Sequence, residues 1–345
     1  MRHGFGFVIA TMLAAACTGG GSPGFAAPLD ASAGSDAASD AADIGDAGDG
    51  GSADAPIIAA PPSLSILSPS AGIAVPAKSE VTYCYYFHTT NTSDLSIKKW
   101  TSHMTAAVVQ TTLFLTPSDQ KLAGTLDSKP CGLFTNSVNV AWTYSANTAD
   151  AEMVLPSDDG NGLPLGQTIR AGQPAILQIH VLNSGDQAIQ AQVELDGYAH
   201  ADGVQVTPVA PFATYNTGID MAPAPSATLP TTTMVNGNCS VEAGAKFFAV
   251  SAHTNKRGVH TFIKDGSTKV FDNVDWQNPE QTTWDAVPFF SFASGKLTYQ
   301  CEYANPSSSR VQAGDTANDE MCVAVGFYFP ADTAGHVCLN SAMLN

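Results

Sequence analysis

The sequence predicts an all-β protein, with two tandem β-sandwich or jelly-roll domains behind a disordered N-terminal tether. Three observations lead to this prediction. Beyond Pro62, short runs of alternating apolar and polar residues are separated by Gly, Pro, Asn and Asp. Residues 18–62 contain almost no large side chains. The cysteines beyond residue 62 fall into an early group and a late group.

Composition limits the partners that the protein can have. An apolar content of 44% in 345 residues is enough for a sizeable core. The formal net charge is -17, and seven aspartates within residues 18–62, a stretch without Lys or Arg, leave -10 for the remainder. Nucleic-acid binding relies on Lys and Arg that neutralise phosphates, so we expect no nucleic-acid partner.

Residues 1–17 have the features of a lipoprotein signal peptide. Arg2 and His3 precede the apolar run "GFGFVIATMLAAA", which is too short for a permanent transmembrane helix, and Cys17 follows it. The ending "LAAAC" resembles a bacterial lipobox, in which the cysteine is lipidated. We therefore expect an exported lipoprotein of the cell envelope or outer membrane surface, attached to the membrane only through Cys17. Ordinary signal cleavage nearby is the alternative.

Residues 18–62 are expected to form the disordered tether. They consist mainly of Ala, Gly, Ser, Asp and Pro. Such a composition cannot bury enough apolar surface to offset the entropy cost of ordering the chain.

Residues 63–345 are expected to form antiparallel strands with one buried face. In "AILQIHVL" the apolar residues Ala175, Leu177, Ile179 and Val181 share a face, and Gln178 and His180 lie on the other. "KLTYQCEY" at residues 296–303 alternates in the same way. Strands of this kind in series predict sandwiches or jelly rolls.

The cysteines divide this region into two predicted domains, residues 63–205 and 206–345. Cys84 and Cys131 lie early, four cysteines follow residue 238, and the Pro- and Thr-rich segment "MAPAPSATLPTTT" lies between the groups. Without Cys17 the count is even, which predicts three disulfides in an exported chain. The absence of a C-x-x-C pair argues against zinc-ribbon and thioredoxin chemistry.

Four segments in the last third of the chain resemble the second domain of the copper type II, ascorbate-dependent monooxygenases. They are "FFAVSAHTNKRGVHTFIKDG", "DWQNPEQTTWDAVPF", "LTYQCEYAN" and "GDTANDEMC". Upstream, "EVTYCYYF" and "ILQIHV" are similar to strands of that family's first domain that carry a cysteine and a copper-ligating histidine. The resemblance covers about residues 63–345, and its specificity rests on the order and spacing of the motifs.

The resemblance implies two jelly-roll domains, each with one copper beside an open, water-filled cleft. Three histidines of the first domain would hold the copper that relays electrons from ascorbate. A His-x-His pair and a methionine of the second domain would hold the copper that activates dioxygen and hydroxylates an aliphatic C–H bond. Imidazole suits both copper oxidation states, and a thioether favours Cu(I). The implied partners are an ascorbate-like reductant and a small-molecule or peptide substrate.

In the second domain the resemblance places Met321 at the methionine ligand and His253 at the first histidine of the pair. Asn255 stands where the second histidine is expected. His260 is the remaining candidate, but seven residues of extended strand span about 23 Å. It can therefore share a metal with His253 only if "NKRG" forms a tight turn that brings it back.

In the first domain the resemblance places His180 at one histidine ligand. The other two ligand positions fall on Val109 and Gln110, and His103 is displaced from them by six residues. One imidazole cannot hold copper tightly, so we expect the electron-relay site to be lost.

The resemblance also implies a disulfide pairing. Cys239 would pair with Cys338 and Cys301 with Cys322, which leaves Cys84 for Cys131. Each bridge would stabilise its domain by about 2–4 kcal/mol.

Structural interpretations compete with these site assignments. Met321 is in phase with Val323, Val325 and Phe327, as a core side chain would be. His180 lies on the less apolar face of its strand, where solvent contact is the alternative to ligation, and His253 can be a hydrogen-bonded strand residue. Three functional hypotheses follow. The chain is a copper monooxygenase-like protein that oxidises C–H bonds with O2 and ascorbate through one copper, an inactive cell-surface binding or structural lipoprotein, or a copper binder without turnover. Whether it is an enzyme stays open.

Overall fold

The computed structural model describes residues 60–129, 131–132, 140–226, 228–277, 279–316, 318–332 and 335–344. The predicted signal peptide, Cys17 and nearly all of the predicted tether lie outside these residues. Within them the secondary structure consists of strands and turns without a helix, so the prediction of an all-β, sandwich-like fold is confirmed. Accordingly, the described part of the chain offers no helix that is long and apolar enough to cross a membrane.

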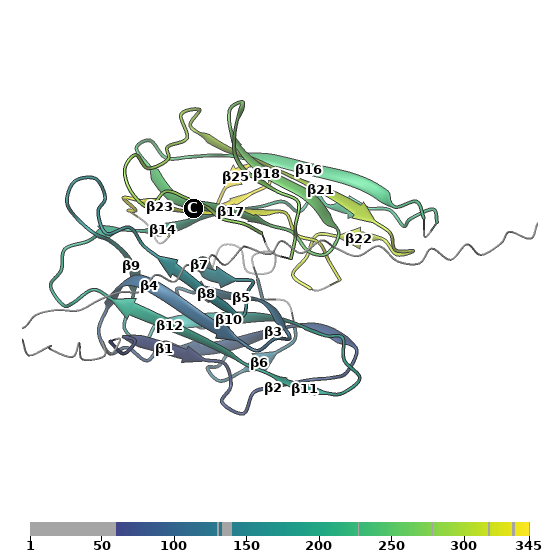
Figure 1. The fold of residues 1–345 in the computed structure, drawn as a ribbon, viewed down its shortest axis with the longest axis horizontal. Coiled ribbons are helices and arrows are strands. Elements are labelled where there is room, and N and C mark those ends of the chain that lie inside the picture. The colour runs from purple at the N-terminus through teal and green to yellow at the C-terminus, as the bar shows by residue number, and fades with distance from the viewer. Residues whose placement is uncertain are drawn as a thin grey trace, which may run out of the picture. The chain divides into compact units, whose positions relative to one another are not determined.

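Strands before Val209 form two sheets and a short ribbon (Figure 1). Sheet I has the order β1-β12-β4-β9-β13, with β8 also paired to β4: β1 Leu64–Leu67, β4 Leu95–Met104, β8 Asp150–Val154, β9 Leu165–Ile169, β12 Val193–Ala199, β13 Thr207–Pro208. Sheet II has the order β6-β3-β10-β5-β7: β3 Ser79–His88, β5 Val108–Leu115, β6 Leu126–Asp127, β7 Ala141–Ala146, β10 Pro174–Asn183. The ribbon pairs β2 Ile73–Val75 with β11 Ile189–Ala191.

Strands after Val209 form two further sheets and a second ribbon. Sheet III has the order β20-β17-β23-β14-β24-β25: β14 Ala210–Tyr215, β17 Lys246–His253, β20 Thr282–Thr283, β23 Val323–Phe329, β24 His336–Leu339, β25 Ala342–Met343. Sheet IV has the order β16-β21-β18-β19: β16 Thr231–Ser240, β18 Gly258–Asp265, β19 Thr268–Asn273, β21 Lys296–Asn305. The ribbon pairs β15 Asp220–Met221 with β22 Val311–Gln312.

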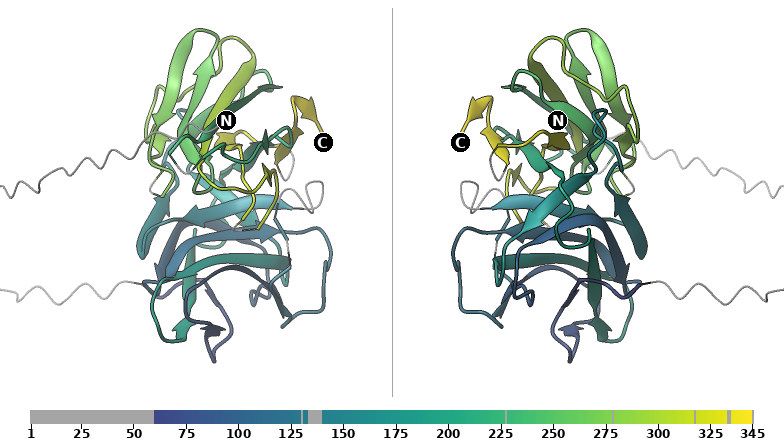
Figure 2. Two further views of the ribbon diagram at one scale, coloured as in Figure 1. Left: turned by 90° about the vertical axis from the view of Figure 1, so that its right-hand side faces the viewer. Right: turned by 90° about the vertical axis from the view of Figure 1, so that its left-hand side faces the viewer.

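Val209 separates two groups of strands that belong to different sheets. Among the described residues, each named strand pairs only with strands on its own side of this residue. The purple-to-teal and green-to-yellow strands accordingly form separate groups in both side views (Figure 2). β13 still pairs with β9, so the change comes slightly after the predicted boundary between residues 205 and 206. The division into two domains stays a prediction.

Four apolar cores among the described residues connect the four sheets, and the smallest joins β9 of sheet I to β17 and β23 of sheet III. One core joins sheets I and II around Trp100 and Leu177. Another joins sheets III and IV around Phe247 and Tyr299. A third lies between sheets II and III and is shared by Phe114, Trp142, Ile176, Tyr215, Val323 and Val325.

The third core corrects one prediction from the sequence. β10 was expected to bury only one face, but its side chains are buried from Ala175 to Val181. Sheet I covers one face of β10, and sheet III covers the face that carries Gln178 and His180. β21, in contrast, alternates between buried and less buried residues as expected.

Three disulfides join Cys84 to Cys131, Cys239 to Cys338 and Cys301 to Cys322. The predicted number is confirmed, and the pairs are those that the resemblance implies. Cys301–Cys322 ties β21 of sheet IV to the residue before β23 of sheet III. It therefore fixes the chain immediately after Met321.

Candidate metal site between sheets II and III

His253 and Met321 line the same small cavity between sheets II and III. His253 ends β17 and pairs with Val323 of β23, two residues after Met321. The cavity has a volume of about 10 Å³, and Gln110, Gln178 and Asp315 are among its other lining residues. This volume accommodates about one water molecule or one ion.

The backbone at Met321 is held from two sides. The Tyr303 hydroxyl donates a hydrogen bond to the Met321 carbonyl oxygen at 2.6 Å. The next residue, Cys322, is bonded to Cys301. The Met321 side chain packs against the core shared by sheets II and III, which is the packing that the structural interpretation predicted. Met321 is thus both a packed side chain and a cavity-lining thioether.

Two amides hold the imidazole of His253. Gln110 Nε2 lies 3.4 Å from His253 Nδ1, and Asn255 Oδ1 lies 3.3 Å from His253 Nε2. The tautomer protonated at Nε2 satisfies both contacts, because Nδ1 then accepts from Gln110 and Nε2 donates to Asn255. These two amides occupy positions at which the resemblance expects copper-ligating histidines.

His253 is neutral at pH 7. Burial, and to a smaller extent the nearby His180, lower the pKa of this imidazole to about 4. The hydrogen bond with Asn255 has the opposite, smaller effect. A neutral imidazole is the form that binds a metal ion.

His180 belongs to an ion-pair network that crosses from sheet II to the loop after β17. Its Nε2 lies 3.1 Å from Glu80 Oε1, and Lys256 Nζ contacts the other oxygen of Glu80. Burial raises the pKa of Glu80, but the hydrogen bonds from His180 and Lys256 outweigh that effect and lower the pKa to about 2. Glu80 is therefore ionised, and it holds the His180 ring nitrogen.

The loop Asn255–Arg257 is anchored on Glu320, which is fully buried. Glu320 accepts hydrogen bonds from the backbone N–H groups of Asn255 at 3.0 Å and of Arg257 at 2.8 Å. The Arg257 guanidinium lies 3.6 Å from the same carboxylate. Burial raises the pKa of Glu320 to about 7, although these donors lower it. The anchor places Asn255 beside His253.

The remaining candidate histidines lie elsewhere. His260 is on β18 of sheet IV, with Asp272 at 2.5 Å and Glu302 at 3.6 Å from its ring nitrogens. It is not among the residues described as lining the cavity with His253 or the neighbouring cavity with His180. His103 is exposed on β4 and pairs with Asp150 at 2.7 Å.

Comparison with known proteins identifies the C-terminal part of the chain. Residues 211–344 match the family model described as "Copper type II ascorbate-dependent monooxygenase, C-terminal domain". These residues belong to the copper type II ascorbate-dependent monooxygenase family. The monooxygenase-like stretch contains His253, Asn255 and Met321, whereas for residues 63–210 the resemblance stays a prediction.

Other comparisons add little to the monooxygenase match. A search of curated proteins returns no match. Among solved structures, the PBSX exported protein XepA is 10% identical, with 76% of this chain and 86% of that chain covered and a TM-score of 0.19. PNGF-II is also 10% identical, with 76% and 60% covered and a TM-score of 0.22. At these TM-scores neither likeness bears on fold or function.

The donor set fits one copper ion and not two. A neutral imidazole and a thioether in one cavity are ligands that Cu(I) accepts. Copper at His253 would have to displace an amide contact, and both contacts are long for hydrogen bonds. His180 and His253 also line a common cavity of about 250 Å³, so among the residues that line the cavities at His180 the one further imidazole is that of His253, and Glu80 already holds the His180 ring. Among the described residues, the cavities at His180 therefore bring no imidazole to it beyond that of His253.

Sequence reasoning did not identify Glu80, Lys256 and Glu320 as parts of this site. Glu320 stood directly before Met321, so its position was a usable signal. Glu80 and Lys256 lie 176 residues apart, and no sequence pattern links them.

Proposed function

We propose that this copper monooxygenase-like protein binds one Cu(I) at His253 and Met321 and does not carry out two-copper hydroxylation. The observation that carries the proposal is the shared cavity, in which a neutral imidazole and a thioether face a space for one ion. Copper held there would supply a Cu(I) centre of the kind that reacts with dioxygen. The protein's own residues would fix the ligands, through Gln110 and Asn255 on the imidazole and Tyr303 on the Met321 backbone.

Side-chain contacts between sheets II and III argue against the two-copper reaction. Gln110 of sheet II contacts His253 of sheet III, and Lys256 contacts Glu80 across the same interface. The open cleft that the resemblance implied between two coppers is thus bridged at this point. Any electrons for a copper at His253 would have to come directly from an external reductant such as ascorbate.

Copper stoichiometry tests the proposal. The full chain, with its disulfides formed, is loaded anaerobically with Cu(I), dialysed and assayed for copper per chain. We expect the wild-type chain to retain about one copper after dialysis and the His253→Gln and Met321→Leu variants to lose it. The matched controls His103→Gln and Met234→Leu change exposed residues of the same types and should retain it. Two coppers per chain would contradict the proposal.

A metal-free binding or structural role is the second candidate. It is favoured by the amide contacts that satisfy both ring nitrogens of His253. This role predicts that no copper survives dialysis and that Met321→Leu leaves every binding property unchanged. A one-copper protein could also turn over. Oxygen consumption with ascorbate would then distinguish an oxidase or monooxygenase from a protein that binds copper without turnover.

We further propose export and lipid attachment through Cys17, on the basis of the "LAAAC" sequence. Metabolic labelling with a radioactive fatty acid tests this in a bacterial host. The wild-type chain should incorporate label and Cys17→Ala should not. Labelling of the Cys17→Ala chain, or none of either chain, would contradict the proposal.

A further inference from the structure

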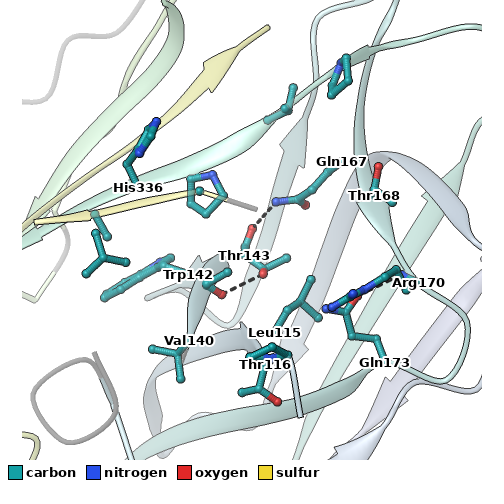
Figure 3. A pocket seen from close by; sticks show the side chains of 18 residues that line it. Leu115, Thr116, Val140, Trp142, Thr143, Gln167, Thr168, Arg170, Gln173 and His336 are labelled. Atoms are coloured by element: carbon teal, nitrogen blue, oxygen red, sulfur yellow. Dashed lines mark hydrogen bonds between the residues drawn. The ribbon is translucent and has the colours of Figure 1, made fainter. Parts of the chain in front are cut away.

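A larger cavity is lined by strands of sheets I, II and III, and Trp142 lines both this cavity and the candidate metal site (Figure 3). Its volume is about 420 Å³, within the range of small-molecule sites. It is lined by the end of β5, by β7 and β9, and by β14 and β24 on the other side. Neither His253 nor Met321 is among its lining residues.

One side of the cavity is apolar and rigid. Val140, Trp142, Val209 and Val337 contribute to it. Trp142 packs edge-on against Phe114, with ring centroids 5.6 Å apart and an interplanar angle of 81°. This contact holds the indole ring in place, so the wall is preorganised for an apolar or aromatic group.

The opposite side carries a cation. Figure 3 shows Arg170 across the cavity from Trp142 and His336. The described residues provide no carboxylate partner for the Arg170 guanidinium, and the residues that line the cavity include neither Asp nor Glu. In a chain with a net charge of -17, a cavity lined without acids and with an arginine favours an anionic ligand.

Gln173 adds a second donor beside Arg170. Its side chain is 8% exposed, and its Oε1 accepts a hydrogen bond from the Arg170 backbone N–H at 3.0 Å. This bond fixes the orientation of the amide, since only the oxygen can accept. Within the described residues Gln173 Nε2 has no hydrogen-bond partner. A guanidinium and a nearby amide donor together match the two oxygens of a carboxylate.

We propose that this cavity binds a small carboxylic acid with an apolar body. The carboxylate lies against Arg170 and Gln173, and the body lies against Trp142. The proposal goes beyond copper binding, because Arg170 and Gln173 do not line the metal cavity and no metal is needed; Trp142 lines both cavities.

Titration of the full-length, disulfide-bonded protein with 3-phenylpropionate, octanoate and the neutral 3-phenylpropionamide tests the proposal. Calorimetry should give an affinity for at least one carboxylate that is about tenfold or more above that of the amide. Arg170→Met should weaken carboxylate binding by about tenfold or more and leave the amide unaffected, and Arg170→Lys should restore part of the loss. Arg310→Met is the matched control, because Arg310 pairs with Asp220 and does not line the cavity.

Three outcomes would overturn the proposal. The first is no binding of either carboxylate up to about 1 mM. The second is equal carboxylate affinity in the wild-type protein and in Arg170→Met. The third is loss of carboxylate binding in His253→Gln, which would assign the ligand to the candidate metal site. If carboxylate binding is unchanged in a His253→Gln protein that has lost copper, the cavity is independent of that site.

Discussion

At the scale of single residues, Glu320 has the largest predicted effect on stability. Glu320→Ala would leave the buried Asn255 N–H and the partly buried Arg257 N–H without their acceptor, and it would remove the carboxylate beside the Arg257 guanidinium. We expect the free energy of unfolding to fall by about 3 kcal/mol, measured by chemical denaturation. The exposed Glu194→Ala serves as a control and should change it by no more than about 0.5 kcal/mol. An equal effect of both substitutions would show that the Glu320 contacts do not stabilise the fold.

A second prediction for a single residue concerns Asp159 and the pH dependence of stability. A hydrogen bond from Thr207 is the main cause that lowers its pKa to about 2; burial opposes this, and the backbone N–H groups of Asn161 and Leu163 support it. A carboxylate with a lowered pKa stabilises the fold above its unfolded pKa of about 4, and this stabilisation is lost as the pH falls from about 4 to 2.

Asp159→Asn should therefore lower stability by up to about 2 kcal/mol at pH 7 and reduce the loss of stability below pH 4. Unfolding curves measured between pH 2 and 7 test this. The neighbouring, exposed Asp158→Asn is the control. An unchanged acid dependence in Asp159→Asn would contradict the prediction.

At the scale of elements, the disulfides should differ in how much they stabilise the fold. Cys301–Cys322 spans 21 residues and Cys239–Cys338 spans 99. In the chain-entropy model, a longer closed loop restricts the unfolded state more. We expect replacement of the first pair by alanines to cost about 3 kcal/mol and replacement of the second about 5 kcal/mol. The reverse order in denaturation experiments would show that native-state packing outweighs loop length.

Local patterns predicted the elements best where one face of a strand is buried by a single neighbour. β21 alternates as its sequence indicates, because it belongs to sheet IV, whose described residues share one core with sheet III. β10 departs from the expected pattern because sheets I and III cover both of its faces. The sequence of β10 alone does not show that sheet III covers its second face, so it does not show which polar residues of that face are buried. His180 was therefore predicted as a candidate ligand, but its pairing with Glu80 was not.

At the scale of the whole molecule, the core between sheets II and III should couple unfolding on both sides of Val209. Phe114, Trp142 and Ile176 pack there against Tyr215, Val323 and Val325. We expect one calorimetric transition, with equal calorimetric and van't Hoff enthalpies. Phe114→Ala should cost about 3–5 kcal/mol and lower the whole transition. Two separate transitions in the wild-type protein would contradict this coupling.

The site itself shows how far sequence could lead. His253 and Met321 were predicted from motif resemblance, and the structure places both at one cavity. The contacts of Gln110 with His253 and of Lys256 with Glu80 join residues 143 and 176 positions apart. Such contacts depend on how two sheets pack, and a one-dimensional pattern does not contain that information. Arg170 was missed for the same reason.

The disulfide between β16 and β24 also determines how the protein responds to proteolysis. Val287 is 63% exposed and lies between Cys239 and Cys338 in the sequence. A single cut near Val287 would break the backbone but leave both pieces covalently joined. We expect nicked protein to migrate as one band on a non-reducing gel and as two after reduction. Two bands without reductant would show that this bond had not formed. A nick at this exposed segment would therefore go unnoticed until the thiols are reduced.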